Sequence, residues 1–71
     1  MDEVQIRDGS IRLVQLLKLA NLVESGSDVR DLVQQGVVLV NGEPELRRGR
    51  QLRDGDVVTV GATSVRVSQV R

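Results

Sequence analysis

The sequence predicts an α+β protein in which two adjacent helices pack on a small, mostly antiparallel sheet. Two observations support this prediction. Apolar residues recur at helical spacing in two successive segments of the first half of the chain, and short β-branched runs separated by turn signals follow in the second half. A chain of 71 residues suffices for one small domain, which we expect to span residues 1–71.

The N-terminal part of the chain predicts a short strand and then the first helix. Residues 3–6 alternate in polarity, and a turn signal follows at residues 8–10. We expect Ser10 to cap the helix, because its hydroxyl can accept a hydrogen bond from a free backbone N–H. The helix has a core-facing stripe of apolar residues, namely Leu13, Leu16, Leu17 and Ala20.

A second helix is predicted after the break at residues 24–27. Either Ser25 or Ser27 can cap it, and the sequence leaves both open. Gly36 stands where a residue with left-handed backbone commonly ends a helix. The apolar residues at helical spacing in this segment are Val29, Leu32 and Val33.

Short β-branched segments in the second half predict the sheet, at residues 37–40, 57–60 and 65–70. Asn41-Gly42 favours the positive φ angles of a tight hairpin turn. Pro44 cannot donate a hydrogen bond to a neighbouring strand, so the returning segment is expected at a sheet edge. We expect the first strand, residues 3–6, to pair with the last strand.

The composition argues against an enzyme. The chain has no histidine and no cysteine, so it lacks the usual general base and the common metal ligands. The seven glycines form no phosphate-binding loop. Asp54 and Asp56 flank Gly55 in a way typical of a turn. We therefore expect no catalytic site, no metal and no cofactor.

Sequence features also predict a cytoplasmic protein, which we expect to be a monomer. The first residues, MDEVQI, are acidic and lack the basic and apolar segments of a signal peptide. The longest apolar run, residues 37–40, is far shorter than the ~20 residues that span a bilayer.

Positive charge is concentrated in one short stretch of a chain whose formal net charge is zero. Residues 47–53, RRGRQLR, contain four arginines and no acidic residue. One interpretation is a charged edge that prevents aggregation of the sheet. The other is nucleic-acid binding, because the planar guanidinium matches phosphate oxygens in two-point contacts. With no aromatic residue in the chain, stacking of bases on aromatic side chains is excluded.

The order of motifs from Arg12 to Val60 resembles a known family. An Arg-Leu start and Leu-Lys-Leu mark the first helix, and Glu-Ser-Gly precedes the second. Then come Leu-Val-x-x-Gly-x-Val-x-Val-Asn-Gly, the arginine-rich stretch and Gly-Asp-x-Val-x-Val. Together they resemble the RNA-binding domain named after ribosomal small-subunit protein four (the S-four domain), in particular small stand-alone bacterial members. The resemblance places the domain core at residues 12–60.

The resemblance implies binding of structured RNA, including ribosomal RNA or a ribosome-associated complex, through a helix–helix–hairpin surface called the alpha-L motif. No cofactor is implied, and a protein partner on the ribosome is compatible with it. Residues at the family's contact positions are Arg12, Lys18, Ser25, Arg30, Asn41, Arg47, Arg48, Arg50 and Arg53. Ser25 could instead serve only as a cap, and Asn41 only as a turn residue.

A protein-interaction module without RNA contact is the alternative. Val-Asn-Gly-Glu and the later Asp-Gly-Asp-Val-Val are also similar to β-grasp sulfur-carrier proteins. Those proteins need a C-terminal Gly-Gly for thiocarboxylate formation, whereas this sequence ends in Ser-Gln-Val-Arg. Such a module, with a β-grasp-like or S-four-like fold, would keep its partner after loss of the arginines.

Overall fold

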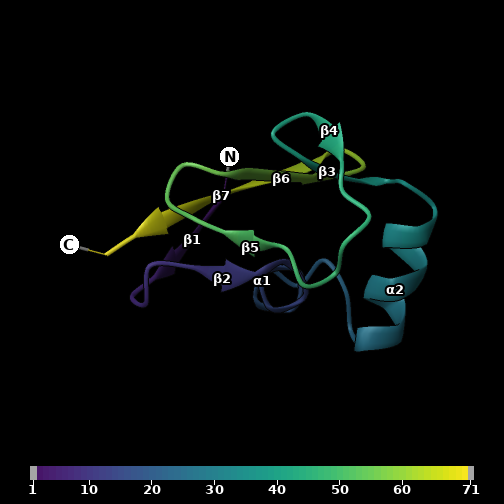
Figure 1. Cartoon of the computed structure of the whole chain (residues 1–71), viewed down its shortest axis with the longest axis horizontal. Coiled ribbons are helices and arrows are strands. Elements are labelled where there is room, and N and C mark those ends of the chain that lie inside the picture. Colours follow the sequence, from purple (N-terminus) through teal and green to yellow (C-terminus); the bar gives the residue numbers. More distant parts are fainter. Residues whose placement is uncertain (1, 71) are drawn as a thin grey trace.

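Two helices and seven strands succeed one another in residues 2–70, the part of the chain that the computed structural model describes (Figure 1). In chain order they are β1 (Asp2–Ile6), β2 (Ile11–Arg12), α1 (Leu13–Leu19), α2 (Gly26–Gln34), β3 (Val38–Val40), β4 (Glu43–Pro44), β5 (Gln51–Leu52), β6 (Val57–Val60) and β7 (Thr63–Gln69).

Five of the strands form one sheet in the order β1-β7-β6-β3-β4. The pairs β7–β6, β6–β3 and β3–β4 are antiparallel, and only β1 and β7 run parallel. The short strands β2 and β5 pair with each other in a second, antiparallel sheet. The predicted α+β class with a mostly antiparallel sheet is therefore confirmed.

The first strand pairs with the last one, as predicted. Asp2 lies opposite Val65 and Ile6 lies opposite Gln69. Beyond the strand, the backbone N–H of Val70 donates to the carbonyl of Ile6 at 2.8 Å. The strands begin slightly earlier than the sequence suggested, at residues 2 and 63 instead of 3 and 65.

Helix α1 begins later than predicted, and Ser10 does not cap it. Residues 11–12 pair with β5 and extend the chain up to the helix, so that Arg12 occupies the cap position. The first helical N–H, that of Leu13, donates to the carbonyl of Arg50 at 2.8 Å. The Ser10 prediction was wrong because a backbone group distant in sequence takes the place of the local hydroxyl.

Helix α2 begins and ends at the predicted signals. The Ser25 hydroxyl accepts a hydrogen bond from the backbone N–H of Asp28 at 3.4 Å, so Ser25 and not Ser27 is the cap. After the helix, Gly36 has a φ of 72°, the left-handed conformation expected there. Val29 and Val33 are buried, which confirms the predicted inner face.

The Asn41-Gly42 hairpin is also confirmed. Asn41 has a φ of 52° and Gly42 a φ of 87°, both positive as a tight hairpin turn between β3 and β4 requires. Pro44 lies in β4, the outermost strand on that side of the sheet. Its missing N–H therefore faces no neighbouring strand.

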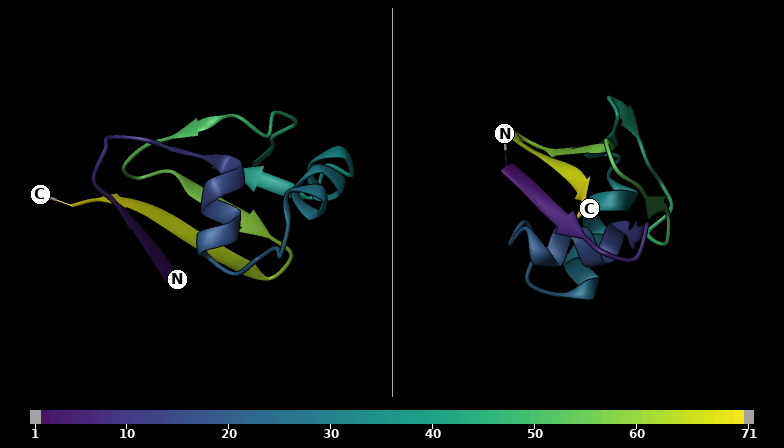
Figure 2. Two further views of the ribbon diagram at one scale, coloured as in Figure 1. Left: turned by 90° about the horizontal axis from the view of Figure 1, so that it is seen from below. Right: turned by 90° about the vertical axis from the view of Figure 1, so that its left-hand side faces the viewer.

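The core lies between the sheet and helix α1. Figure 2 shows α1 crossing one face of the sheet, with α2 beside the end of β3. The buried apolar side chains are leucine, isoleucine and valine throughout, namely Ile6, Ile11, Leu13, Leu16, Leu17, Val29, Val33, Val38, Val40, Leu52, Val58, Val65 and Val67. Since a chain of this size buries only ~60% of its unfolded surface, each of these residues matters for stability.

Leu16→Ala should destabilise the protein by about 2–5 kcal/mol, because Leu16 is fully buried and its truncation leaves a cavity. Urea unfolding followed by circular dichroism measures the change. Leu19→Ala is the matched control in the same helix, at a side chain that is 64% exposed, and should cost less than about 1 kcal/mol. Equal losses in both variants would contradict the assignment of the core.

Candidate nucleic-acid interface

Residues 47–53, hereafter the basic segment, lie against the start of helix α1. The carbonyl of Arg50 accepts from the N–H of Leu13 at 2.8 Å, and the carbonyl of Arg48 accepts from the N–H of Val14 at 3.2 Å. The segment then continues as β5, in which Gln51 lies opposite Arg12. Backbone contacts of this kind hold the segment in place and leave its side chains available for other partners.

Glu45, just before the basic segment, is the charged residue that the sequence analysis missed. Its side chain is buried, with only 7% of the residue exposed. One carboxylate oxygen accepts from Nη1 of Arg50 at 2.7 Å. The other accepts from Nε of Arg47 at 3.1 Å and from the backbone N–H of Arg47 at 3.0 Å. Two of the four arginines therefore share one buried counter-charge.

These contacts change the acidity of the carboxyl group. The hydrogen bonds from Arg50 and then from Arg47 lower the pKa of Glu45 to about 2, against the opposing effect of burial. The same carboxylate raises the pKa of Arg50. Glu45 is therefore an anion at neutral pH, and both ion pairs are fully formed there.

The four arginines of the basic segment differ in their availability. Arg50 is paired and only 33% of its side chain is exposed, whereas Arg47 is paired with 76% of its side chain exposed. Arg48 and Arg53 are exposed, and in residues 2–70 their side chains form no hydrogen bond or ion pair. Arg48 therefore offers the least constrained guanidinium next to helix α1.

The predicted helix residues are all exposed, but only one adjoins the basic segment. Arg12 precedes α1 and lies opposite Gln51 in the β2–β5 pair. Lys18 is in the last turn of α1, and Arg30 is within α2. In the described residues no hydrogen bond or ion pair connects either Lys18 or Arg30 to the basic segment.

The two uncharged candidates already have structural partners. The Ser25 hydroxyl caps α2, as described above, and lies 3.0 Å from the Ser27 hydroxyl. The Asn41 amide donates to Asp56 at 3.1 Å and accepts from the N–H of Val57 at 3.0 Å. Both therefore have roles in the fold that are independent of any ligand.

Asp56 connects the hairpin turn to the end of the basic segment. One oxygen accepts from the Asn41 amide, and the other accepts from the N–H of Arg53 at 2.9 Å. Burial alone would raise the pKa of Asp56, but these hydrogen bonds and the charges of Arg50 and Arg53 lower it overall. The backbone at Arg53 is thus fixed while its side chain remains exposed.

The protein-family model described as the S4 domain matches residues 4–68, nearly the whole chain. The chain belongs to the S4 domain family. The resemblance to the S-four domain is thereby confirmed, and the match extends beyond residues 12–60 into β1 and β7.

Two relatives support the same assignment for this S4 domain. It is 44% identical over 57 residues to a probable ribosome maturation protein, RlbA, of Bacillus subtilis, a match that covers 80% of each chain. It is 46% identical over 54 residues to the small ribosomal subunit protein uS4m of Schizosaccharomyces pombe. That second match covers 76% of this chain but only 16% of the yeast protein.

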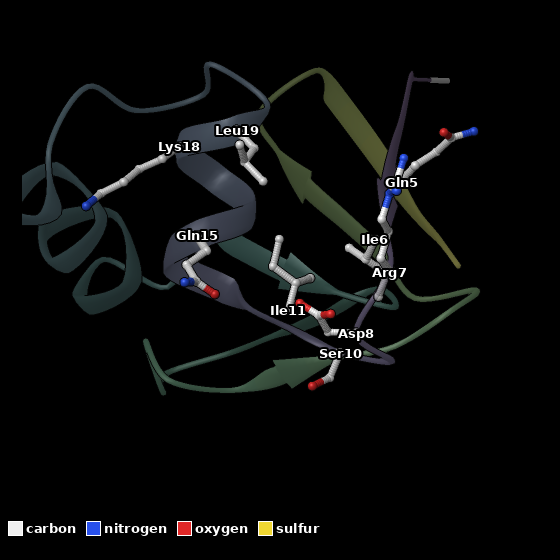
Figure 3. A pocket seen from close by; sticks show the side chains of 9 residues that line it. All are labelled: Gln5, Ile6, Arg7, Asp8, Ser10, Ile11, Gln15, Lys18 and Leu19. Atoms are coloured by element: carbon white, nitrogen blue, oxygen red, sulfur yellow. The ribbon is translucent and has the colours of Figure 1, made fainter. Parts of the chain in front are cut away.

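The S4 domain also has an open groove between α1 and the end of β1, with a volume of about 570 Å³ (Figure 3). Ile6, Ile11 and Leu19 supply its apolar lining. Of the predicted contact residues only Lys18 borders the groove, and its side chain extends away from Ile11 and Leu19 in Figure 3. The groove is therefore separate from the arginines of the basic segment.

Residues 2–70 contain neither a cluster of metal-ligating side chains nor a helix that could span a membrane. No group of three or more acidic, histidine or cysteine side chains is placed to hold a metal ion. Neither helix in this range is long and apolar enough to cross a membrane.

Lowering the pH should destabilise the S4 domain over the pH range in which the Glu45 carboxylate becomes protonated. Because the pKa of Glu45 is lower in the folded state, its contribution to stability is complete above about pH 4.5 and is lost as the pH falls toward about 2. Thermal unfolding followed by circular dichroism between pH 7 and pH 2 measures this loss. In Glu45→Gln the loss should be smaller than in wild type.

Glu43→Gln is the matched control for this measurement. Glu43 is exposed on β4, and no salt bridge to it occurs in residues 2–70. Its removal should leave the acid-induced loss close to that of wild type. An identical acid profile for wild type and Glu45→Gln would contradict the assigned role of the Glu45 carboxylate.

Proposed function

We propose that this S4 domain is a non-enzymatic protein that binds structured RNA through the basic segment and the start of helix α1. The observation that supports this most directly is the backbone attachment of the segment to Leu13 and Val14. It fixes the position of Arg48 while leaving its guanidinium exposed and unpaired within residues 2–70. Unpaired guanidinium groups carried on a fixed backbone are suited to phosphate oxygens.

The binding surface combines Arg48 and Arg53 with Arg47, whose side chain remains largely exposed despite its ion pair. Arg12 adjoins this set from β2, and Lys18 and Arg30 extend it along the helices. We propose that the two helices and the hairpin form the alpha-L arrangement. Arg50, Ser25 and Asn41 act mainly by holding this surface together.

Recognition of RNA shape and phosphates fits this surface better than reading of individual bases. The chain has no aromatic side chain on which an unpaired base could stack. Its net charge of zero limits attraction to nucleic acid in general, so that binding depends on the local cluster. Salt should weaken such an interaction strongly.

The names of the two relatives suggest the kind of RNA. One is a probable ribosome maturation protein and the other a ribosomal subunit protein. We therefore propose ribosomal RNA, or a ribosome-associated complex, as the target of a cytoplasmic monomer. Residues 1–71 would act as one domain, of which Met1 and Arg71 lie outside the described residues.

Arg48→Ala should weaken binding to structured RNA and reduce the steepness of its salt dependence by roughly one phosphate contact, a change of about 0.7–0.9 in the slope of log affinity against log salt. Fluorescence anisotropy with a labelled RNA hairpin, at low and near-physiological salt, measures both. The triple replacement of Arg47, Arg48 and Arg50 by alanine should weaken binding further.

Arg66→Ala is the matched control, because Arg66 is exposed on β7 and lies outside the basic segment. It removes the same charge and should change the affinity much less. A labelled DNA duplex in parallel tests preference for RNA. Absence of RNA binding by wild type at low salt would reject the proposal and favour the alternative, a protein-interaction module.

A further inference from the structure

We infer that Glu45 is a positioning residue for RNA binding: it organises residues 47–50 into the shape that presents Arg48, although its own charge repels phosphate. This inference rests on the proposed function. Removal of this acidic residue should weaken binding to RNA, a polyanion. Charge alone would predict the opposite, a gain in affinity.

The Glu45 carboxylate bridges the two ends of a turn. Its two oxygens bind Arg47 and Arg50, the two ends of the turn at residues 47–50. A backbone hydrogen bond from the N–H of Arg50 to the carbonyl of Arg47, at 3.3 Å, closes the same turn. Arg48 and Gly49 therefore form an exposed tip over a buried anion.

Glu45 is itself held by the main sheet. Its backbone N–H donates to the carbonyl of Val38 in β3 at 3.0 Å. The Glu45 carboxylate binds the turn at residues 47–50. The carbonyls of Arg48 and Arg50 in this turn accept hydrogen bonds from the first helical N–H groups of α1. The turn is thus supported on both sides, by the sheet through Glu45 and by the helix through its backbone.

Such support reduces the entropic cost of binding. A free arginine side chain loses rotamer freedom when it contacts RNA, and this loss weakens binding. Arg47 and Arg50 are already restrained by their ion pairs. Without the carboxylate, the turn and its arginines would have to become ordered on binding.

The competing explanation is that Glu45 only offsets charge. It predicts that Glu45→Gln, by removing a negative charge from the site, strengthens binding and steepens its salt dependence. The positioning role predicts weaker binding in spite of the lost negative charge. The sign of the change in affinity therefore separates the two explanations.

The experiment compares Glu45→Gln with Glu43→Gln, an equal change in charge at an exposed residue two positions earlier on β4. Anisotropy titration of the labelled RNA hairpin should give roughly tenfold weaker binding for Glu45→Gln, since two side chains regain freedom. Glu43→Gln should bind as well as wild type or more tightly. Binding by Glu45→Gln at or above the wild-type affinity would overturn the inference.

Glu45→Asp provides a second test in which the net charge is unchanged. The shorter side chain cannot reach both Arg47 and Arg50, so its binding should also weaken, and Glu43→Asp is its control. If Glu45→Gln does not fold by circular dichroism, this pair of variants decides. Wild-type affinity in Glu45→Asp would then reject the positioning role.

Hydrogen exchange adds a measurement that requires no RNA. The amide hydrogens of Leu13 and Val14 donate to the turn, so they should exchange faster in Glu45→Gln while those of β6 stay protected. Unchanged exchange at Leu13 and Val14 would contradict the inference. Lack of RNA binding by wild type is a different outcome, because it rejects the proposed function itself.

Discussion

Two backbone hydrogen bonds, from Leu13 to Arg50 and from Val14 to Arg48, join the basic segment to the first turn of α1. They satisfy N–H groups that a helix leaves without partners at its start. They also determine where the helix begins and which path the arginines follow. Both contacts use carbonyl groups, so they leave the guanidinium of Arg48 available, while the guanidinium groups of Arg47 and Arg50 bind Glu45.

A neutral protein can present a positive surface when some of its acidic side chains are buried and its basic side chains are exposed. Glu45 is buried beneath the turn, whereas Arg47 and Arg48 are exposed above it. From outside, an anion covered by two arginines has less effect on an approaching phosphate than an exposed one. The formal net charge of the chain therefore says little about the potential at this surface.

Local chemistry made much of the fold predictable. The Asn41-Gly42 turn and Gly36 follow from preferences of single residues or pairs, and both occur where the sequence placed them. The cap of α2 is Ser25, one of the two serines that the sequence offered. The family was also recognisable from the order of its motifs. The Ser10 cap failed because the carbonyl of Arg50, far away in sequence, occupies the place that a local hydroxyl would take.

The sequence could not predict which arginines of the basic segment form ion pairs and which do not. Glu45 lies only two residues before Arg47, but nothing in the sequence indicates that its side chain turns inward and binds Arg50 as well. That arrangement depends on β3 and α1 enclosing the turn. Sequence spacing identified the cluster, whereas only the packing distinguishes a restrained guanidinium from an available one.

The parallel pairing of β1 with β7 has a consequence for synthesis of the chain on the ribosome. Of the strands in residues 2–70, β1 is made first and its neighbour in the sheet, β7, is made last. Until Thr63–Gln69 has emerged, β1 has no partner and β6, an apolar strand of valines and threonine, is an open sheet edge. A nascent or truncated chain that lacks β7 would therefore be an aggregation-prone species, and the emergence of β7 is what joins β1 to the rest of the sheet.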